Sequence, residues 1–515
     1  MIQSKDLETR LNQHFQFDRF REGQKEIITD VMADKDVLGI LPTGSGKSLC
    51  YQLPAMLLPG TTVVISPLIS LMNDQVKQLK SMNFKQVIAF NSFIDSGTRR
   101  IALKNLSAYK LIYVSPELLQ DQHVQTQLKR ISISLFVVDE AHCISQWGHE
   151  FRPDYLKLND TIQLIGNPPV LALSATAPQA VQDDIIHSLK RPNMVKHIYP
   201  MDRENIALSI CRVQHDTDKM EKITNLLETY HVPTLIYFSS RRAAEMVTDE
   251  LLGKLPTKRI AFYHGGMEPI DRIAIQQQFM NDQLDVVCCT NAFGMGIDKN
   301  NIRLIIHYHF PPQLEAFIQE VGRAGRDGKA SVSVLLYSEQ DTYLPQNMIE
   351  QDLPTEDQLR HVVQYVANMP SNQISPKFDD CMAHKLQVNE IQWRFIHYQL
   401  EKNDILNNNK IVDLPKHWKH VFDIINTHRK KRKQLKQAKL MDMISWMNET
   451  ECLRKHLYKH FQRGYQTPTM FCCSNCGLSW DKWQPEQSVN KTKALGTWQA
   501  KLTKVLCIGE NDESK

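Results

Sequence analysis

The sequence lacks long apolar runs and shows almost no excess of either charge. No stretch approaches the ~20 consecutive apolar residues of a membrane-spanning helix, so we expect no membrane partner. The 61 Lys and Arg residues against 57 Asp and Glu residues leave a net charge of only +4. Because a strongly basic chain is the usual signal of a nucleic-acid binder, any basic surface here must be local.

We also expect no secretory signal, since the first ten residues are mostly polar and charged. The eleven cysteines are therefore expected to be thiols in a reducing compartment and not disulfides. These features predict a cytoplasmic protein. The 515 residues, 42% of them hydrophobic, suit about three or four domains with proper cores.

One motif, residues 41–48, lies between a predicted strand and a predicted helix and reads LPTGSGKS. Leu41 stands where a phosphate loop usually has its first Gly, but the remaining Gly-x-Gly-Lys-Ser is specific. Lys47 would reach the outer phosphates of a nucleotide, and the Ser48 hydroxyl would hold Mg²⁺. An ordinary Gly-rich turn is the alternative. We expect the nucleotide to be bound by Pro42, Thr43, Gly44, Ser45, Gly46, Lys47 and Ser48.

Residues 11–32 show a helical apolar periodicity, and they include the stretch FDRFREGQ at residues 17–24. The Gln24 amide can both donate to and accept from an adenine edge, and the Phe17 ring can stack on the base. Core packing is the alternative for Phe17. Its position just before a phosphate loop favours base binding.

Short apolar runs alternate with helical segments from residue 37 to residue 337. Such runs, separated by helices, indicate parallel sheets covered on both faces. A break near Pro200 divides the runs into two series, which predicts two α/β domains meeting near residues 200–215. We expect strands at residues 37–41, 62–66, 111–114, 135–139 and 170–174, and then at 234–238, 285–289, 304–308 and 332–336.

Polar motifs follow two of these strands, where open α/β sheets bind ligands. Asp139 and Glu140 begin the sequence DEAH. Asp139 can hold Mg²⁺ through water, and Glu140 can orient or deprotonate the attacking water; a solvated acidic turn is the alternative. Ser174 and Thr176 end the next strand and could relay hydrogen bonds between a nucleotide site and a polymer site.

In the second series, residues 319–326 read QEVGRAGR. Arg323 and Arg326 are three positions apart, so on one helical face they would project together. Two guanidinium groups aimed across a cleft between domains would stabilise charge on a transferring phosphoryl group. A salt-bridged surface helix is the alternative, and the flanking glycines argue against it.

Residues 143–155, CISQWGHEFRPDY, directly follow the acidic motif. Trp147, His149, Phe151 and Arg152 are of the kinds that stack on unpaired bases. We expect this loop to bind single-stranded DNA and to touch the nucleotide site. A hydrophobic plug under the sheet would explain Phe151 but explains His149 and Arg152 poorly.

These motifs resemble those of superfamily 2 helicases, and specifically those of the RecQ family of DNA helicases. Residues 17–24, with Arg21, resemble the family's adenine-reading motif. Residues 139–155 resemble its DEAH box and aromatic-rich loop, and residues 319–328, with Gln319, resemble its last helicase motif. Spacing alone would have predicted only a two-domain NTPase motor.

The resemblance implies two RecA-like domains that use ATP and Mg²⁺ to unwind DNA in the 3′-to-5′ direction. It also implies single-stranded and tailed or forked DNA as partners, a role in recombination and repair, and contact with other repair proteins. An RNA helicase, a translocase that does not unwind and a non-hydrolysing DNA-binding scaffold are the alternatives. Intact Lys47, Glu140, Arg323 and Arg326 argue against the scaffold.

Beyond residue 337 the predicted pattern is helical and no strand pattern persists. We expect domains at residues 1–205 and 206–340, a mainly helical module at 341–480 and a mobile tail at 481–515. The basic run at residues 428–433 is as compatible with a phosphate contact as with a solvated face. Only residues 477–515 follow Cys476, so we expect no winged helix of about 100 residues there and no additional nucleic-acid-binding domain.

The RecQ resemblance further implies a zinc site in the helical module, and structural zinc takes four Cys or His ligands. Ser479 stands where one common form of the site has its last Cys. His456 is an alternative fourth ligand, and a lapsed site with ordinary thiols is the other alternative. We expect one zinc ion held by Cys452, Cys472, Cys473 and Cys476.

Overall fold

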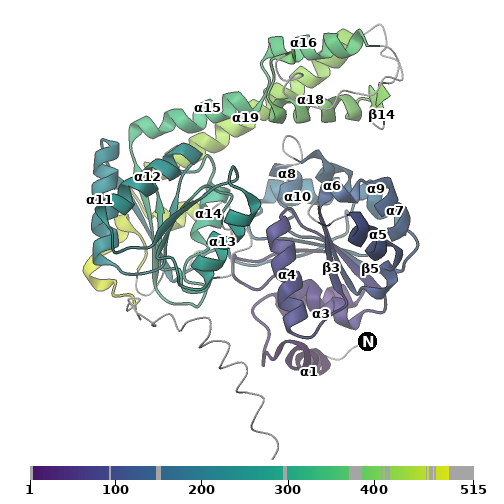
Figure 1. Ribbon diagram of the computed structural model, residues 1–515, viewed down its shortest axis with the longest axis horizontal. Coiled ribbons are helices and arrows are strands. Elements are labelled where there is room, and N and C mark those ends of the chain that lie inside the picture. The colour runs from purple at the N-terminus through teal and green to yellow at the C-terminus, as the bar shows by residue number, and fades with distance from the viewer. Residues whose placement is uncertain are drawn as a thin grey trace, which may run out of the picture.

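The protein is described here by a computed structural model. It covers residues 4–91, 94, 96–146, 152–293, 299–369, 385–407, 410–411, 418–459, 461–462, 468 and 471–486. Figure 1 shows two sheets side by side, each flanked by helices, with a helical arm extending above them. Among the described residues, no helix combines the length and apolar character needed to cross a membrane.

The first sheet has seven parallel strands in the order β3-β4-β2-β5-β6-β1-β7. Every residue of β1 and β6 is buried, as expected for parallel strands covered on both faces. The strands are β1 (Val37–Ile40), β2 (Thr61–Ile65), β3 (Val87–Phe90), β4 (Leu111–Val114), β5 (Ile133–Val138), β6 (Val170–Ser174) and β7 (Val195–Ile198).

The second sheet has six parallel strands in the order β10-β11-β9-β12-β13-β8. The predicted fold class, two tandem RecA-like parallel-sheet domains with a mainly helical C-terminal module, is confirmed; the domain boundaries stay predictions. The strands are β8 (Ile206–Arg212), β9 (Thr234–Tyr237), β10 (Ile260–Tyr263), β11 (Val286–Cys289), β12 (Leu304–His307) and β13 (Ser331–Tyr337).

The four strands that the sequence did not predict in these sheets, β3, β7, β8 and β10, are the outermost strands of the two sheets. An edge strand has a neighbour on one side only, so solvent reaches part of it. Each of these four strands contains positions that are not fully buried. The continuous apolar run that marks a central strand is therefore weaker at the edges.

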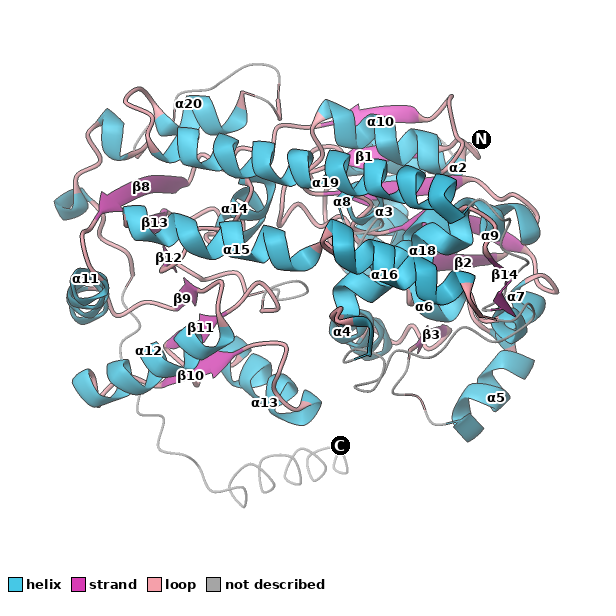
Figure 2. Cartoon of the chain, turned by 90° about the horizontal axis from the view of Figure 1, so that it is seen from above, coloured by secondary structure: helices cyan, strands magenta, loops and turns pink. Residues whose placement is uncertain are grey.

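Helices cover the faces of both sheets (Figures 1 and 2). Those of the first sheet are α1 (Ser4–Phe15), α2 (Gln24–Met32), α3 (Leu49–Leu57), α4 (Ile69–Ser81), α5 (Ser96–Lys104), α6 (Pro116–Leu119), α7 (Gln122–Leu128), α8 (Cys143–Gln146), α9 (Leu158–Leu164) and α10 (Gln179–Ser188). Those of the second sheet are α11 (Asp216–Thr229), α12 (Arg241–Lys254), α13 (Pro269–Met280) and α14 (Leu314–Val321). Short 3₁₀ turns include η1 (Leu106–Ala108), η2 (Pro153–Lys157) and η3 (Glu339–Thr342).

The helical periodicity predicted over residues 11–32 is interrupted, and that prediction is wrong in the middle of the range. Helix α1 ends at Phe15 and α2 begins at Gln24. Gln16 has φ 58° and Gly23 has φ 81°, which lie in the left-handed region that an α-helix cannot use. Phe17 and Arg21 therefore lie on the connection between two helices.

The C-terminal module is built around one long helix, α19 (Trp418–Met447), which lies beside α15 (Tyr343–Asp352) (Figures 1 and 2). Its remaining elements are α16 (Glu356–Ala367), α18 (Glu390–Lys402), α20 (Leu453–Tyr458), η4 (Ser474–Cys476), η5 (Trp480–Lys482), β14 (Leu406–Asn407) and β15 (Lys410–Ile411). The antiparallel pair β14–β15 is a hairpin that the sequence did not predict. We call α16, α18, this hairpin and the first half of α19 the arm; it has its own hydrophobic cluster.

Among the described residues, polar contacts join the arm to the first sheet's domain. Lys157 Nζ lies 2.7 Å from Glu401 Oε2, and the Arg432 guanidinium donates to the Ser145 carbonyl at 3.3 Å. In the basic run, Lys430 lies 3.6 Å from the Glu356 carboxylate. Exposed ion pairs of this kind contribute little to stability. At this position the basic run therefore joins α19 to α16 only weakly.

Trp446 ties α19 to the second sheet. Its side chain is fully buried, and its indole nitrogen donates to the Leu453 carbonyl at 2.9 Å. Its ring centroid lies 4.6 Å from that of Phe317 on α14. This contact anchors the C-terminal module to the helix that leads into the predicted arginine motif.

We expect Trp446→Ala to destabilise the protein by about 3–5 kcal/mol, because it leaves a large cavity under α19. Trp446→Phe should lose only about 1 kcal/mol, since it keeps an aromatic ring and loses one hydrogen bond. Urea unfolding followed by far-UV circular dichroism measures both. Equal stability of Trp446→Ala and the wild type would show that α19 does not depend on this contact.

Candidate functional site

A cavity of about 690 Å³ opens between residues 41–48, which we call the phosphate loop, and residues 322–328, which we call the arginine turn. Both sheets contribute to its walls. Pro42 and Ser45 are not among its lining residues. The predicted residues that line it are Phe17, Arg21, Gln24, Thr43, Gly44, Gly46, Lys47, Ser48, Asp139, Glu140, Gln319, Arg323 and Arg326.

The phosphate loop joins the end of β1 to the start of α3. Gly44 has φ 85° and Gly46 has φ 77°, values that a residue with a Cβ rarely adopts. A Cβ on Gly46 would also lie 2.8 Å from Gln24 Nε2. Glycine is therefore needed at both positions for the loop to turn into the N-terminus of α3. Backbone N–H groups at a helix N-terminus favour anions.

Opposite charges meet on the floor of the cavity. Burial lowers the pKa of Lys47, and the nearby carboxylates of Glu140 and Asp139 oppose that change. Burial also raises the pKa of Asp139 to about 7, with a further rise from Glu140 and an opposing effect from Lys47. A divalent cation beside Asp139 would favour the carboxylate again, so the donor set of Ser48 and Asp139 fits Mg²⁺.

Glu140 has φ 49°, which is uncommon for a residue other than glycine and is typical of functional sites. Its backbone N–H donates to Asp139 Oδ1 at 2.9 Å. Among the described atoms, Glu140 Oε2 is buried without a hydrogen-bond partner, and it lies 3.4 Å from His142 Nδ1. A carboxylate held in this way is available to a water molecule in the cavity.

His142 connects Glu140 to the end of β6. Its Nδ1 lies 3.0 Å from Ser174 Oγ, and the Ser174 hydroxyl donates to the Thr176 carbonyl at 3.2 Å. Burial lowers the pKa of His142, and Glu140 opposes that change. Both Ser174 and Glu140 face Nδ1, so an imidazole protonated there can donate to one of them at a time. The relay through Ser174 and Thr176 stays a prediction.

The two arginines reach the cavity from the second sheet. Because α14 ends at Val321, Arg323 and Arg326 lie in the arginine turn, and the predicted helical face is wrong. Arg323 is 4% exposed and contacts the Tyr237 hydroxyl. A Cβ on Gly44 would lie 3.1 Å from Arg326 Cγ, so Arg326 lies against the phosphate loop.

Gln24 and Arg21 hold the phosphate loop from the outside. Gln24 Nε2 donates to the Ser45 carbonyl at 2.8 Å and to the Gly46 carbonyl at 3.0 Å. Arg21 Nη1 donates to the Gly44 carbonyl at 2.5 Å. These contacts support the loop that would cradle the phosphates, while adenine recognition by Gln24 stays a prediction.

Phe17 and Gln319 lie at other parts of the cavity wall. Phe17 is 53% exposed, although its ring centroid lies 6.4 Å from that of Phe15. An exposed aromatic ring beside a nucleotide-sized cavity is free to stack on a base. Core packing does not account for its position.

The predicted DNA-binding loop is only partly described, since Trp147, His149 and Phe151 lie outside the described residues. Arg152 Nε lies 3.5 Å from Glu117 Oε1, and the Arg152 guanidinium also donates to the Pro67 carbonyl. These contacts join the C-terminal end of the loop to the segments that follow β2 and β4. Stacking of Arg152 on a base stays a prediction.

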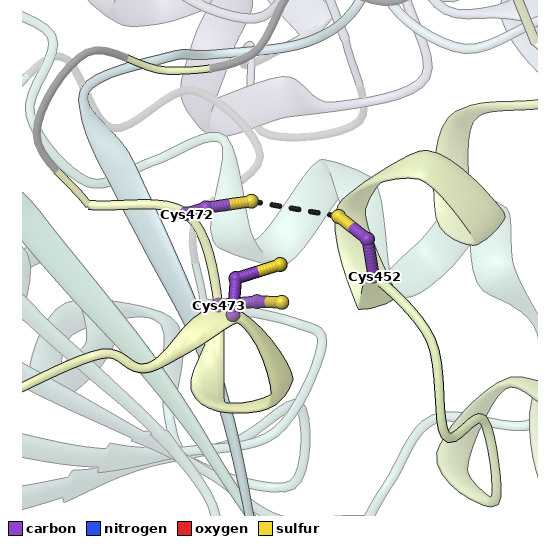
Figure 3. A group of neighbouring side chains, drawn as sticks. Cys452, Cys472 and Cys473 are labelled. Atoms are coloured by element: carbon purple, nitrogen blue, oxygen red, sulfur yellow. Dashed lines mark hydrogen bonds between the residues drawn. The ribbon is translucent and has the colours of Figure 1, made fainter.

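The four predicted zinc ligands come together beside the edge strand β8. The Sγ atoms of the cysteine cluster all lie within 4.8 Å of one another, and Cys452 Sγ is 3.5 Å from Cys472 Sγ (Figure 3). Four thiolates at this spacing suit tetrahedral zinc. His456 instead pairs with the Glu449 carboxylate. The cluster consists of Cys452, Cys472, Cys473 and Cys476.

Sequence reasoning missed Arg203 and His142. His142 was visible only as part of the DEAH sequence, and its contact with Ser174 depends on how two strands lie side by side. Arg203 lies in residues 199–205, the linker between β7 and β8, where no motif marks it. Its Nη1 donates to the Thr43 carbonyl at 2.9 Å.

Three family models match separate parts of the chain. The DEAD/DEAH box helicase model matches residues 21–184, and the helicase conserved C-terminal domain model matches residues 218–328. The RecQ zinc-binding model matches residues 404–477, which include the cysteine cluster.

Solved structures of helicases share the fold. The *Mycobacterium smegmatis* helicase Lhr bound to single-stranded DNA and AMP-PNP superposes with a TM-score of 0.56 at 21% identity, over 80% of this chain and 61% of that chain. *Saccharomyces cerevisiae* Dbp5 bound to RNA and ADP-BeF₃ superposes with a TM-score of 0.54 at 18% identity, over 65% of this chain and 88% of that chain. At these identities the likeness concerns the fold alone.

Relatives at higher identity fix the family. The probable ATP-dependent DNA helicase RecS of *Bacillus subtilis* is 38% identical over 98% of this chain and 98% of its own length. The ATP-dependent DNA helicase RecQ of *B. subtilis* is 39% identical over 69% of this chain, which spans 61% of that protein. The chain spans 52% of the *Haemophilus influenzae* RecQ helicase, at 39% identity. The chain therefore belongs to the RecQ family of ATP-dependent DNA helicases.

Proposed function

We propose that this protein is an ATP-driven motor that moves 3′ to 5′ on single-stranded DNA and separates tailed or forked duplexes. One observation carries the proposal: a single cavity receives Lys47, Asp139 and Glu140 from the first sheet and Arg323 and Arg326 from the second. Hydrolysis at such a site can be coupled to movement, because its parts belong to two bodies that can change their separation.

Each of these residues has a separate role in the proposed hydrolysis. Lys47 neutralises charge on the outer phosphates, and Glu140 orients the attacking water and accepts its proton. Arg323 and Arg326 stabilise the charge that develops on the transferring phosphoryl group. Bound Mg²⁺, held by Ser48 and Asp139, would supply further neutralisation of the phosphates.

DNA binding would reach the ATP site through the segment that follows Glu140. His142 links Glu140 to Ser174, and residues 143–155 lead directly from it into the aromatic-rich loop. Stacking of Trp147 on an unpaired base would fix one end of that segment. Binding or release of the DNA base at Trp147 can therefore alter the position of Glu140.

The remaining parts of the proposal concern context. The relatives' names are those of DNA helicases, which favours DNA over RNA as the substrate and recombination and repair as the process, with other repair proteins as partners. The nine described cysteines form no disulfide with one another, which supports a reducing, cytoplasmic location.

Strand displacement tests the proposed function. We expect ATP to drive displacement from a DNA duplex with a 3′ single-stranded tail, and little displacement from the same duplex with a 5′ tail. Replacing ATP with AMP-PNP is the control. Displacement of an RNA duplex with equal efficiency would favour the RNA helicase, and DNA-stimulated ATP hydrolysis without displacement would favour the translocase.

We expect Lys47→Ala to abolish ATP turnover, since the buried phosphate charge loses its cation. Glu140→Gln should bind nucleotide normally and hydrolyse it about 10²–10⁴-fold more slowly, because the general base is lost. Lys254→Ala is a matched control, as Lys254 forms an exposed ion pair with Glu250 on α12. Phosphate release measures turnover; near-normal rates in either site variant would contradict the assignment.

Trp147→Ala should leave ATP hydrolysis without DNA near the wild-type rate. Its stimulation by single-stranded DNA and its unwinding rate should both fall, because stacking is worth about 1–3 kcal/mol per base. Trp147→Phe keeps a ring that can stack and should restore part of the loss. If Trp147→Ala unwinds normally, the side chain only packs within the protein.

We expect one zinc ion per chain in protein washed with a mild chelator. Cys476→Ser and Cys472→Ser should lose the metal and lower the melting temperature, because metal binding contributes folding free energy. Cys211→Ser, at a half-buried cysteine on β8, should retain the metal. Elemental analysis measures the content. Zinc kept in Cys472→Ser but lost in His456→Ala would make His456 the fourth ligand.

A further inference from the structure

One guanidinium group touches both walls of the ATP cleft from the linker. Arg203 Nη1 donates to the Thr43 carbonyl of the phosphate loop at 2.9 Å. Arg203 Nη2 donates to the Gly325 carbonyl of the arginine turn at 2.5 Å, and Nη1 is 3.4 Å from the Gly322 carbonyl. These contacts join the phosphate loop to the arginine turn through the linker.

The positions of these carbonyls matter for the two arginines. Gly322 and Gly325 lie on either side of Arg323, so their carbonyls fix the turn that presents it. Thr43 directly precedes Gly44, the residue against which Arg326 lies. A planar guanidinium holds several acceptors at once in a fixed geometry, which a lysine amine cannot do. Arg203 therefore sets how the arginine turn sits over the phosphate loop.

The linker that carries Arg203 is itself held by the C-terminal module. The Arg454 side chain, buried on α20, contacts the Asp202 carboxylate and the Ile206 carbonyl. Gln462 Oε1 accepts hydrogen bonds from the backbone N–H groups of Met201 at 2.9 Å and Asp202 at 3.1 Å. These contacts hold the backbone on both sides of Arg203 in place.

A structural ion pair does not explain why the Arg203 guanidinium lies in the cleft. Among the described residues, no carboxylate lies within ion-pair distance of its guanidinium, whereas Arg454 has Asp202. Burial lowers the pKa of Arg203, and the Tyr458 hydroxyl opposes that change. Its hydrogen bonds go instead to backbone carbonyls of the phosphate loop and the arginine turn, which suits a side chain that holds these two segments together.

We propose that Arg203 is a positioning residue for ATP hydrolysis, which ties the phosphate loop to the arginine turn so that Arg323 and Arg326 meet the phosphates. It acts through these two arginines and does not perform the chemistry itself. The inference rests on hydrolysis at the phosphate loop as proposed above. If the wild type hydrolyses no ATP, the proposed function fails. If the wild type is active, its rate is the reference with which the Arg203 variants are compared.

Steady-state ATP hydrolysis with saturating single-stranded DNA tests this role. In Arg203→Ala we expect kcat to fall about tenfold or more, because charge-assisted hydrogen bonds across the cleft are lost. The KM for ATP should stay within about threefold, since the phosphate loop and adenine side belong to the first sheet. Arg203→Lys should recover part of kcat, because one amine can replace Nη1 between the Thr43 and Gly322 carbonyls but leaves the Gly325 carbonyl without the donor that Nη2 supplies.

Arg212→Ala is the matched control, because Arg212 donates to the Met447 carbonyl and to Asn448 Oδ1, away from the cleft. It should keep the wild-type kcat. Small-angle scattering with and without AMP-PNP gives an independent readout: we expect AMP-PNP to compact the wild type and Arg212→Ala but not Arg203→Ala.

Three results would overturn the proposal. One is a wild-type kcat in folded Arg203→Ala, and another is a raised KM with unchanged kcat, which would place Arg203 in nucleotide binding. The third is an Arg203→Lys variant that folds like the wild type but has no more activity than Arg203→Ala while still compacting with AMP-PNP. If Arg203→Ala fails to fold, the Arg203→Lys measurements decide the question.

Discussion

The phosphates of a bound nucleotide have to be neutralised from two sides, and each sheet supplies only one of them. Lys47 lies in the first sheet's domain, whereas Arg323 and Arg326 come from the second, and all three line the same cavity. Neither sheet's domain alone presents both Lys47 and the two arginines of the arginine turn. In the proposed hydrolysis the separation of the two sheets would control the chemistry, and the linker and the C-terminal module that holds it would then be part of the motor.

Within the first sheet, the site is maintained at a cost to local stability. Glu140 keeps an uncommon backbone conformation, and burial raises the pKa of Asp139 to about 7. Buried charges of this kind are unfavourable until a ligand compensates for them. The rigid surroundings of β1, β5 and β6, all of them central strands, hold these groups in place. A nucleotide with its cation would relieve the imbalance.

The sequence predicted the parts of this site that follow central strands, because buried parallel strands leave continuous apolar runs and their ends carry the motifs. It did not predict the edge strands, whose burial is partial, or the break before Gln24, which depends on backbone turns at two residues. It placed Arg323 and Arg326 on a helix because spacing alone cannot show that Val321 ends α14. Arg203 was invisible, since its partners are backbone carbonyls contributed by distant segments.

A crystal structure with AMP-PNP, Mg²⁺ and single-stranded DNA is the most direct test of the two-sided site. The account predicts that the outer phosphate lies between the Lys47 amine and the guanidinium groups of Arg323 and Arg326, with the cation beside Ser48 and Asp139. It would be contradicted by a nucleotide bound to the first sheet alone, with both arginines turned away from the phosphates.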